Sequence, residues 1–331
     1  MWGSLIEPIL LGADENGFVH PNINLHTVRT YRSSCDSPNL QQVPKHNKLI
    51  KKIVRSGFIP RGKDRQLCEI DLQSAEVSVG CCLHQDKQML QFLHDKTIDM
   101  HTYVEREFYK LKPEELSKEL RSSVKGRFVF ASFYGASPLS MAASLWEFIE
   151  ESNTVLPTGE KLIDHMAKLG VVDYETCLVH TEKVFDWYWK VLFKDYGAWK
   201  ENIWALYKQQ GYLDYPTGFR VVSPMAKTQA MNTIIQGSTF HLLLFTLIEL
   251  QRRLTHYNLG SKIVCQIHDS IVLDLVPSEL QTVFDLYLDS QDTVRKKWKW
   301  LLYPITADAD LGEIGGTWAE MNGYGELKHA N

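Results

Sequence analysis

The sequence lacks the features that define several classes of protein. Its six cysteines include no CxxC pair, which argues against a zinc site or a disulfide framework and for reduced thiols. No run of about 20 apolar residues is present, so no membrane span or membrane partner is expected. The N-terminus has neither the positive segment nor the apolar stretch of a secretory signal, and a cytoplasmic location is expected, in the host if the source is viral. The cysteines are Cys35, Cys68, Cys81, Cys82, Cys177 and Cys265.

The sequence also lacks low-complexity tracts, internal repeats and a clear linker. Its 331 residues suit one large domain or two medium ones. The hydrophobic content of 44% is enough for a core, and the charged content of 23% is ordinary for a globular protein. These values exclude intrinsic disorder and fibrous structure.

Charge is distributed unevenly. The formal net charge of −4 argues mildly against a nucleic-acid partner. Between Lys45 and Arg65, however, eight Lys and Arg residues accompany a single acid, and a second basic cluster, Arg295–Trp300, contains two tryptophans. Such runs either bind phosphate backbones or form a solvated face, and both interpretations stay open.

The pattern of apolar residues predicts an α+β fold. Helices are expected over 74–94, 99–109, 113–133, most of 136–210, 227–256 and 277–301, with Asp99 as the N-cap of its helix. Strands are expected over 66–71, 261–267, 270–275 and 304–311, and a tight turn at 268–269 joins two of them. The chain therefore predicts a small antiparallel sheet with a mostly helical insertion between its strands.

Two carboxylates stand at the ends of expected strands. Asp71 follows the apolar run that ends at Ile70, and Asp269 lies in the hairpin turn. Carboxylates at strand ends of one sheet can hold two Mg²⁺ ions about 3.5–4 Å apart, the arrangement used for in-line displacement at phosphorus. Each acid also has an ordinary structural interpretation, Asp71 as a helix N-cap and Asp269 as a turn residue.

A third segment combines cations with aromatic rings. Arg121 and Lys125 are four residues apart, as are Phe130 and Tyr134, so each pair shares a helix face. Cations beside rings suit a nucleoside triphosphate, with charge for the phosphates and a ring for the base. An ordinary amphipathic helix would show the same spacing.

Six segments taken in order resemble the motifs of the polymerase domain of the DNA polymerase I family (family A). The family motifs TGRLSS…PNLQNIP, DYSQIE, DIH, RxxxKxxxFxxxYG, NxxxQG and QVHDE are matched by residues 30–44, 71–76, 99–101, 121–135, 231–237 and 266–269. Each match is weak by itself, but six in the same order are specific.

The resemblance implies a right-hand polymerase with a palm and fingers that transfers a dNMP from a dNTP to a primer 3′-hydroxyl on template DNA. Asp71, Asp269 and the backbone carbonyl of Leu72 would hold two Mg²⁺ ions, for which Mn²⁺ can substitute. The residues implied to bind the nucleotide are Arg121, Lys125, His101, Phe130, Tyr134, Glu76 and Ser74. Those implied to contact DNA are Arg32, Asn39, Gln41, Asn232, Gln236 and His268.

The resemblance also implies individual roles. Arg121 and His101 would grip the triphosphate with Lys125, which is the candidate to protonate the leaving group because an ammonium shifts its pKa more readily than a guanidinium. The ring of Phe130 would pack on the incoming nucleotide, and Tyr134 would stack at the templating position. The carboxylate of Glu76 would act as a steric gate against a 2′-hydroxyl, which favours DNA over RNA synthesis.

The implied domain order is palm, fingers, palm. Residues 1–28 are expected to form a residual thumb or palm entry segment, and 29–111 the first part of the palm with the first catalytic motif. Residues 112–210 are expected to form the fingers, and 211–331 the second part of the palm with the second catalytic motif.

Three departures from the family pattern bear on the site. Lys125 and Tyr134 are nine residues apart where the family has eight, and a π-bulge between 125 and 130 is expected to restore the face. The alternative register puts Ser122 and Gly126 at the phosphate positions, which suit a triphosphate poorly. Ser270 replaces the glutamate of the second catalytic motif. Thr228 stands where the family has an arginine, with Lys227 beside it.

Fewer than 30 residues precede the first matched motif, which leaves little room for a thumb and none for an exonuclease domain. The sequence therefore predicts the catalytic part of a split polymerase, with the thumb or exonuclease on a second polypeptide, or a minimal polymerase of low processivity. The compact length suggests a phage-like source. Two other functions are weighed: a non-catalytic DNA-binding or assembly subunit, and a nucleotidyl transferase that acts on RNA or without a template.

Overall fold

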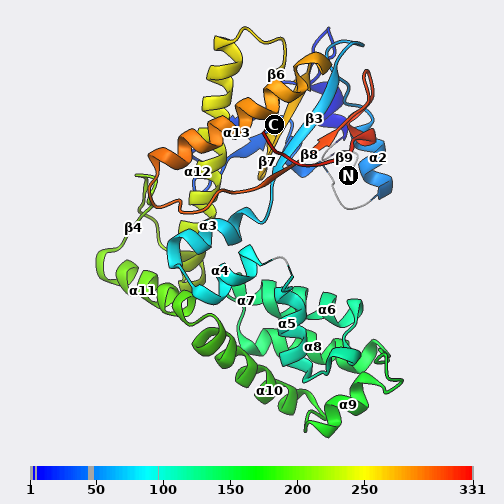
Figure 1. Ribbon diagram of the computed structural model, residues 1–331, viewed down its shortest axis with the longest axis vertical. Helices are drawn as coiled ribbons and strands as arrows, with labels where there is room; N and C mark the ends of the chain where they lie inside the picture. Colours follow the sequence, from blue (N-terminus) through cyan, green and yellow to red (C-terminus); the bar gives the residue numbers. More distant parts are fainter. Residues whose placement is uncertain (1–2, 4–5, 44–47, 96, 330–331) are drawn as a thin grey trace. The chain divides into compact units, whose positions relative to one another are not determined.

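The computed structural model describes residues 3, 6–43, 48–95 and 97–329. The chain forms two compact units (Figure 1). Unit 1 comprises Met1–Leu83, Asp214–Ser223 and Thr233–Asn331, and unit 2 comprises His84–Leu213 and Pro224–Asn232. The first division at residues 83 and 84 differs from the fingers boundary expected at residue 112, and the expected domain limits remain an interpretation of the sequence.

The elements follow in chain order. The strands are β1 (Asn22–Asn24), β2 (Ser34–Asp36), β3 (Gln66–Leu72), β4 (Leu213–Asp214), β5 (Arg220–Val221), β6 (Lys262–Ile267), β7 (Ser270–Leu275), β8 (Ala307–Leu311) and β9 (Asn322–Glu326). The α-helices are α1 (Glu7–Leu11), α2 (Lys48–Arg55), α3 (Ala75–His84), α4 (Lys87–His94), α5 (Met100–Tyr109), α6 (Lys118–Val124), α7 (Ala131–Phe133), α8 (Pro138–Glu151), α9 (Leu162–Lys168), α10 (Tyr174–Trp187), α11 (Lys194–Gln210), α12 (Lys227–His256) and α13 (Leu280–Lys297). Two π-helices, η4 (Lys125–Phe130) and η5 (Tyr188–Leu192), interrupt the helices of unit 2. Short 3₁₀ turns are η2 (Leu40–Gln42), η3 (Pro113–Glu115), η6 (Pro277–Glu279) and η7 (Trp318–Glu320).

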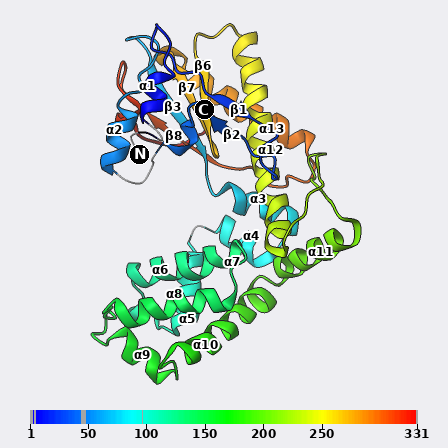
Figure 2. The ribbon, with the colours of Figure 1, turned by 180° about the vertical axis from the view of Figure 1, so that it is seen from behind.

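Unit 1 is built on a five-stranded antiparallel sheet with the order β6-β7-β3-β8-β9. Strand β3 is central and pairs with β7 on one side and β8 on the other. In both views α12 and α13 lie on one side of this sheet and α2 on the other (Figures 1 and 2).

The main core of unit 1 covers one face of the sheet. Every second residue of β3, beginning at Cys68, points to this face because side chains alternate along a strand. Their partners on β7 and β8 are equally apolar, and α3, α12 and α13 cover them. The core strand residues are Cys68, Ile70, Leu72, Ile271, Leu273, Leu275, Ala307 and Ala309.

The opposite face of the sheet is rich in acids. Residues that oppose each other in antiparallel strands point to the same side, so Glu69 shares a row with Val272 and Asp310, and Asp71 shares one with Ser270 and Asp308. A smaller apolar cluster covers part of this face and includes Val54 of α2 and Trp318 of η7. We call this the acidic face.

Unit 2 is almost entirely helical. Its core contains the fully buried rings of Phe108, Phe128 and Tyr188, which meet edge to face or tilted. Helices α8 and α10 pack together, as do α5 and α6.

The predicted α+β class is confirmed, and several elements match closely. The expected helix over 227–256 is α12, and the hairpin at 268–269 joins β6 to β7. The expected continuous helix over 74–94 is wrong, because Gln85 takes a left-handed φ of 52° and Asp86 caps a new helix, α4. The strand β9 was not predicted, because its residues Asn322–Glu326 contain two glycines and no apolar alternation.

Helix α12 is, within the described part of the chain, the one helix long and apolar enough to cross a membrane by length and composition. The sequence had indicated no such segment. Since 67% of its apolar window is buried inside the fold, α12 has the character of a core helix.

Candidate active site

The two predicted metal carboxylates lie at adjacent strand ends in unit 1. Asp71 is the penultimate residue of β3 and opposes Ser270, the first residue of β7. Asp269 therefore lies one residue beyond that pair, and the amide of Leu72 donates to the Asp269 carbonyl at 3.2 Å. The antiparallel register thus brings together two segments almost 200 residues apart in sequence.

Arg32 bridges two of the predicted site residues. Its Nη1 donates to Glu76 Oε1 and its Nη2 to Asp269 Oδ1, both at 3.2 Å. Burial raises the pKa of Glu76, the nearby Arg32 cation opposes that shift, and Asp269 adds to it. The sequence pointed to Arg32 as a DNA contact, whereas here its guanidinium balances the charge of two carboxylates.

The donor set around Asp71 fits a hard divalent cation in its chemistry. Two carboxylates and the carbonyl of Leu72 are oxygen donors, and Mg²⁺ commonly uses one or two carboxylates and completes its shell with water and substrate phosphates. Among the described residues, no group of three or more His, Cys, Asp or Glu side chains is arranged to hold a metal. The donors that the resemblance assigns to such a site are the carboxylates of Asp71 and Asp269 and the Leu72 carbonyl.

The backbone on either side of these acids is held in unusual conformations and by hydrogen bonds. Ser74 precedes α3 with a φ of 45°, a left-handed conformation that disfavours a residue with a Cβ by about 1 kcal/mol. His268, exposed in the hairpin turn, has a φ of 52°. Its carbonyl accepts from Gln266 Nε2 at 2.6 Å. A chain of hydrogen bonds continues from Gln266 Oε1 to Ser33 Oγ at 2.6 Å and on to Gln41 Nε2 at 2.8 Å.

Two of the predicted DNA contacts therefore have internal partners. Gln41 joins the chain that supports the hairpin turn, and Asn39 caps η2 by accepting from the Gln41 amide at 3.1 Å. Asn232 and Gln236 are half-buried and one turn apart on α12. Gly237, next to Gln236, is crowded: a Cβ there would lie 2.3 Å from Tyr215 Cε1 and 2.6 Å from the Thr30 carbonyl oxygen.

In unit 2, the expected π-bulge is confirmed. Residues Lys125–Phe130 form η4, the π-helix between α6 and α7. The wider turn absorbs the ninth residue and leaves Lys125 Nζ 5.2 Å from the centre of the Phe130 ring. Lys125 thus stays on the aromatic face, where the alternative register would have put Ser122 and Gly126.

Two further predicted phosphate contacts lie beside Lys125. Arg121 is held by Asp99, with Nε at 2.9 Å from Oδ1 and Nη2 at 2.5 Å from Oδ2. This hydrogen-bonded guanidinium holds the pKa of Asp99 far below its usual range. The His101 ring meets the Phe130 ring edge to face at 5.7 Å, and its Nδ1 is buried with no protein partner among the described residues. Burial lowers the pKa of His101 to about 4, with Arg121 contributing.

The rings at the C-terminal end of this helix are open to solvent. Tyr134 is 59% exposed and Phe130 is 40% exposed.

Gly135 follows with a φ of 80°, and a Cβ there would meet Thr228 Cγ2 at 2.6 Å. Thr228, which replaces the family's arginine, therefore packs on the turn that ends the helix. Neighbouring Lys227 pairs with Glu201.

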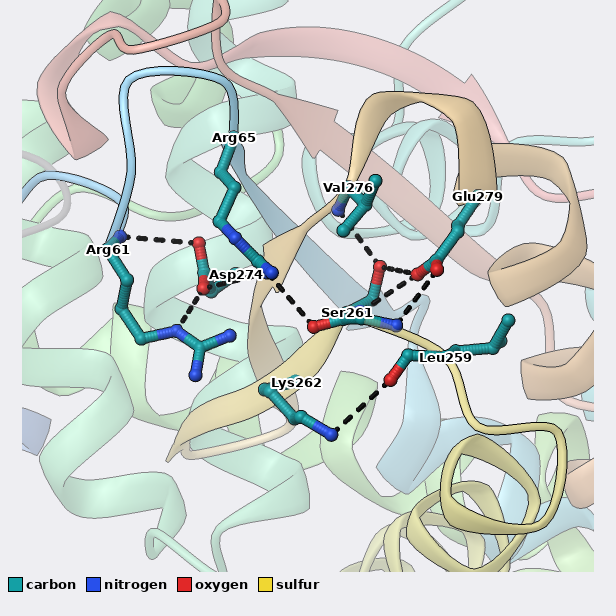
Figure 3. A network of polar contacts seen from close by, with 9 residues as sticks. Arg61, Arg65, Leu259, Ser261, Lys262, Asp274, Val276 and Glu279 are labelled. Atoms are coloured by element: carbon teal, nitrogen blue, oxygen red, sulfur yellow. Dashed lines mark hydrogen bonds and ion pairs between the residues drawn. The ribbon is translucent and has the colours of Figure 1, made fainter.

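The basic stretch over 45–65 is only partly available for phosphate. Arg55 is buried and pairs with Glu69. Arg61 and Arg65 both bind the buried carboxylate of Asp274 (Figure 3). Lys52 and Lys63 are exposed. Pro44 and Lys45 of the matched and basic segments, with the side chain of Lys48, lie outside the described residues.

The network around Asp274 is structural. Figure 3 shows Arg65 reaching from Asp274 to the segment before β6, where its Nη1 donates to the Gly260 carbonyl at 2.9 Å. Glu279 accepts from the amides of Gly260 and Ser261, both at 2.8 Å. The network fixes the far end of the β6–β7 hairpin. The second basic cluster differs, because Lys296, Lys297 and Lys299 are exposed. Arg295 and Lys296 pair with Asp292 on the same helix, and the rings of Trp298 and Trp300 stack.

Sequence reasoning missed three acids on the acidic face, Glu69, Asp308 and Asp310. Asp308 on β8 opposes Asp71 and accepts from Gln73 Nε2. Glu69 is buried beneath Arg55 and Trp318. The two-residue spacing of Glu69 and Asp71 was the available signal, because it puts both on one face of β3.

Comparison with known proteins identifies the family. The model of DNA polymerase family A matches residues 4–157 and 199–320. DNA polymerase I of Mycobacterium tuberculosis is 24% identical over 285 residues, and the DNA polymerase of Bacillus phage SP01 is 25% identical over 303. These alignments cover 86% of this chain but only 29% and 30% of those proteins.

A solved structure shows the same fold. The POL domain of M. smegmatis Pol1, in complex with DNA primer-template and dNTP, aligns with a TM-score of 0.71 and 19% identity. It covers 95% of this chain, which in turn spans 50% of that one. The family model covers most of the chain, including all six matched segments, and the chain belongs to DNA polymerase family A.

Proposed function

We propose that this chain carries out template-directed DNA synthesis, transferring a dNMP from a dNTP to a primer 3′-hydroxyl. The observation that carries the proposal is the meeting of Asp71 and Asp269 at paired strand ends of one sheet. A helix cap or a turn would explain each acid by itself, but neither role requires that two acids from distant segments lie together. The solved relative bound to primer-template and dNTP supports DNA and dNTP as ligands.

The carboxylates of Asp71 and Asp269, with the Leu72 carbonyl, would hold the divalent metals, expected to be Mg²⁺. When bound, such ions lower the pKa of the attacking hydroxyl and stabilise the charge that develops on the pyrophosphate. Arg32 holds Asp269 in place before metal binds and neutralises part of the local negative charge. Metal binding at Asp269 would have to share or replace that guanidinium.

The nucleotide would be selected and held by the remaining residues. Glu76, kept in position by Arg32, would lie beneath the sugar and exclude a 2′-hydroxyl. In unit 2, Lys125 and Arg121 would bind the triphosphate and Phe130 would pack on the nucleotide. His101 is neutral at pH 7, so it would donate a hydrogen bond to a phosphate oxygen instead of contributing a full charge.

Lys125 would give a proton to the pyrophosphate oxygen as the bond to the α-phosphorus breaks. Its ammonium lies against the Phe130 ring, which keeps it on the face where the triphosphate is expected. Phosphoryl transfer depends mainly on positioning and charge stabilisation, so the placement of this donor is what the proposal requires.

The context of this activity is a finer proposal. The chain spans about 30% of the length of the relatives named above. We propose a second polypeptide as a source of further contacts to the duplex, and the cytoplasm as the location. The alternative is a non-catalytic DNA-binding subunit. The meeting of Asp71 and Asp269 does not favour it, because DNA binding alone requires no pair of metal-binding carboxylates.

Primer extension by the purified chain with Mg²⁺ and dNTPs tests the proposal. Asp71→Ala and Asp269→Ala should each abolish extension, while Asp274→Asn, an acid change at the other end of β7, should reduce stability without removing activity from the folded fraction. Extension that survives both alanine variants would refute two-carboxylate catalysis. DNA binding without extension by the wild-type chain would favour the non-catalytic alternative.

A further inference from the structure

Ser270 is the one departure within the second catalytic motif that the proposed function leaves unexplained. It follows Asp269 directly and opposes Asp71 across the β3–β7 pair. Its side chain is only 2% exposed. A residue in this position is too buried to meet substrate, so its role must be sought in its protein contacts.

The Ser270 hydroxyl joins two groups. It lies 3.0 Å from the Ile267 carbonyl, across the hairpin turn, and 3.0 Å from Glu69 Oε1 on the neighbouring strand. The hydroxyl can donate to either oxygen. It therefore ties both ends of the turn that carries His268 and Asp269 to strand β3.

Glu69 is itself anchored from the other side. Its Oε2 accepts from Trp318 Nε1 at 3.1 Å and from Arg55 Nη1 at 3.3 Å, and Arg55 stacks on the Trp318 ring at 4.1 Å. Glu69, Arg55 and Trp318 are each 3–4% exposed. A buried carboxylate is stable only when charged and neutral donors satisfy it; here Trp318 and Arg55 donate to Glu69, and the Ser270 hydroxyl can add a third hydrogen bond.

We propose that Ser270, which contacts the Ile267 carbonyl and the anchored carboxylate of Glu69, is a positioning residue for Asp269. The inference rests on the proposed role of Asp269 as a metal ligand. A glutamate at position 270, as in the family motif, would put a second carboxylate within hydrogen-bond distance of Glu69. In this chain position 270 holds a serine, and the carboxylate that its hydroxyl contacts is that of Glu69 on β3. The turn that presents Asp269 is thereby held by a buried anchor independent of ligand.

The test compares Ser270→Ala with Ser270→Thr and with a matched control, Ser290→Ala. Ser290 is also fully buried, and its hydroxyl donates to the Leu286 carbonyl at 2.6 Å within α13. Two readouts are needed: deuterium uptake of the peptide that contains residues 267–270, and the Mg²⁺ concentration that gives half-maximal primer extension. Loss of a group that orients a metal ligand typically weakens metal affinity or activity about 10- to 100-fold.

The expected result is faster deuterium uptake in the turn and at least about a tenfold higher Mg²⁺ requirement in Ser270→Ala. Ser270→Thr, which keeps the hydroxyl, should restore both, and Ser290→Ala should change neither. Unchanged uptake in the Ser270→Ala turn would overturn the inference, as would equal effects in Ser290→Ala. If the wild-type chain fails to extend a primer while uptake still rises only in Ser270→Ala, the proposed function fails but the anchoring of the turn stands.

Discussion

Replacing Gly237 by alanine tests how closely α12 is packed at its predicted DNA-facing turn. In an open helix, Gly→Ala stabilises a protein by about 0.5–1 kcal/mol, because alanine loses less backbone entropy on folding. At Gly237 the new Cβ would lie 2.3 Å from Tyr215 Cε1 and 2.6 Å from the Thr30 carbonyl oxygen. One of these neighbours is a ring in the core and the other is backbone, so neither can move away without further rearrangement.

The two contributions have opposite signs, and the clash is larger. Overpacking a buried site costs about 1–3 kcal/mol, and two simultaneous contacts put Gly237 at the upper end of that range. After subtracting the gain in helix propensity, the free energy of unfolding should fall by about 2 kcal/mol. Gly126 is the matched control, since it is helical and a Cβ there would meet no atom within 4 Å.

Urea unfolding followed by circular dichroism measures both variants. Gly126→Ala should unfold at the same or a higher urea concentration than the wild type, and Gly237→Ala at a clearly lower one. Gly237→Ala with a midpoint equal to that of Gly126→Ala would refute the reasoning, because it would mean that the contacts at Thr30 and Tyr215 relax freely.

Three further predictions concern other parts of the chain. Deleting Gly126 should convert the π-helix to α-helix and leave primer extension intact, whereas deleting Ala131, in the α-helical turn after it, should rotate Tyr134 by about 100° and reduce extension. Lys200 is buried against Trp189 and Tyr196, and burial lowers its pKa to about 8. Between pH 8 and 10.5 the unfolded chain therefore binds this proton more strongly than the folded chain, so raising the pH stabilises the fold. The urea midpoint of the wild type should rise over this range relative to that of Lys200→Met. Ser270→Glu should lower the thermal midpoint by placing two buried carboxylates together, and Glu69→Ser in the same chain should recover part of the loss, with an additive result counting against the contact.

The sequence predicted the structure best where a residue with a chemical role also lies in a clear local pattern, such as a turn or a helix. The hairpin with Asp269 in its turn follows from two β-rich runs with a two-residue gap, and the π-bulge follows from a single surplus residue between Lys125 and Tyr134. The long helix α12 follows from 30 residues without a proline, many of them good helix formers. The α+β class follows from the order of these elements.

What could not be predicted depends on distant partners. Arg32 looks like a free cation in the sequence, and only the meeting of the β3 and β7 ends brings it between Glu76 and Asp269. Arg55 stands in a basic stretch, yet it is buried because Glu69 and Trp318 approach from other segments. Such pairings depend on sheet register and not on local sequence, so charge runs alone overstate the surface available to DNA.

The π-helix at Lys125–Phe130 has a consequence for how residues are matched between relatives. A single extra amino acid here is confined to one widened turn, so the side chains before and after it keep their faces. An alignment that places the gap elsewhere in this helix would equate Lys125 with the wrong position and transfer its role to a serine or glycine. In this chain the backbone fixes the correct position of the gap, and a misplaced gap would make the chain look like a degenerate copy of the family.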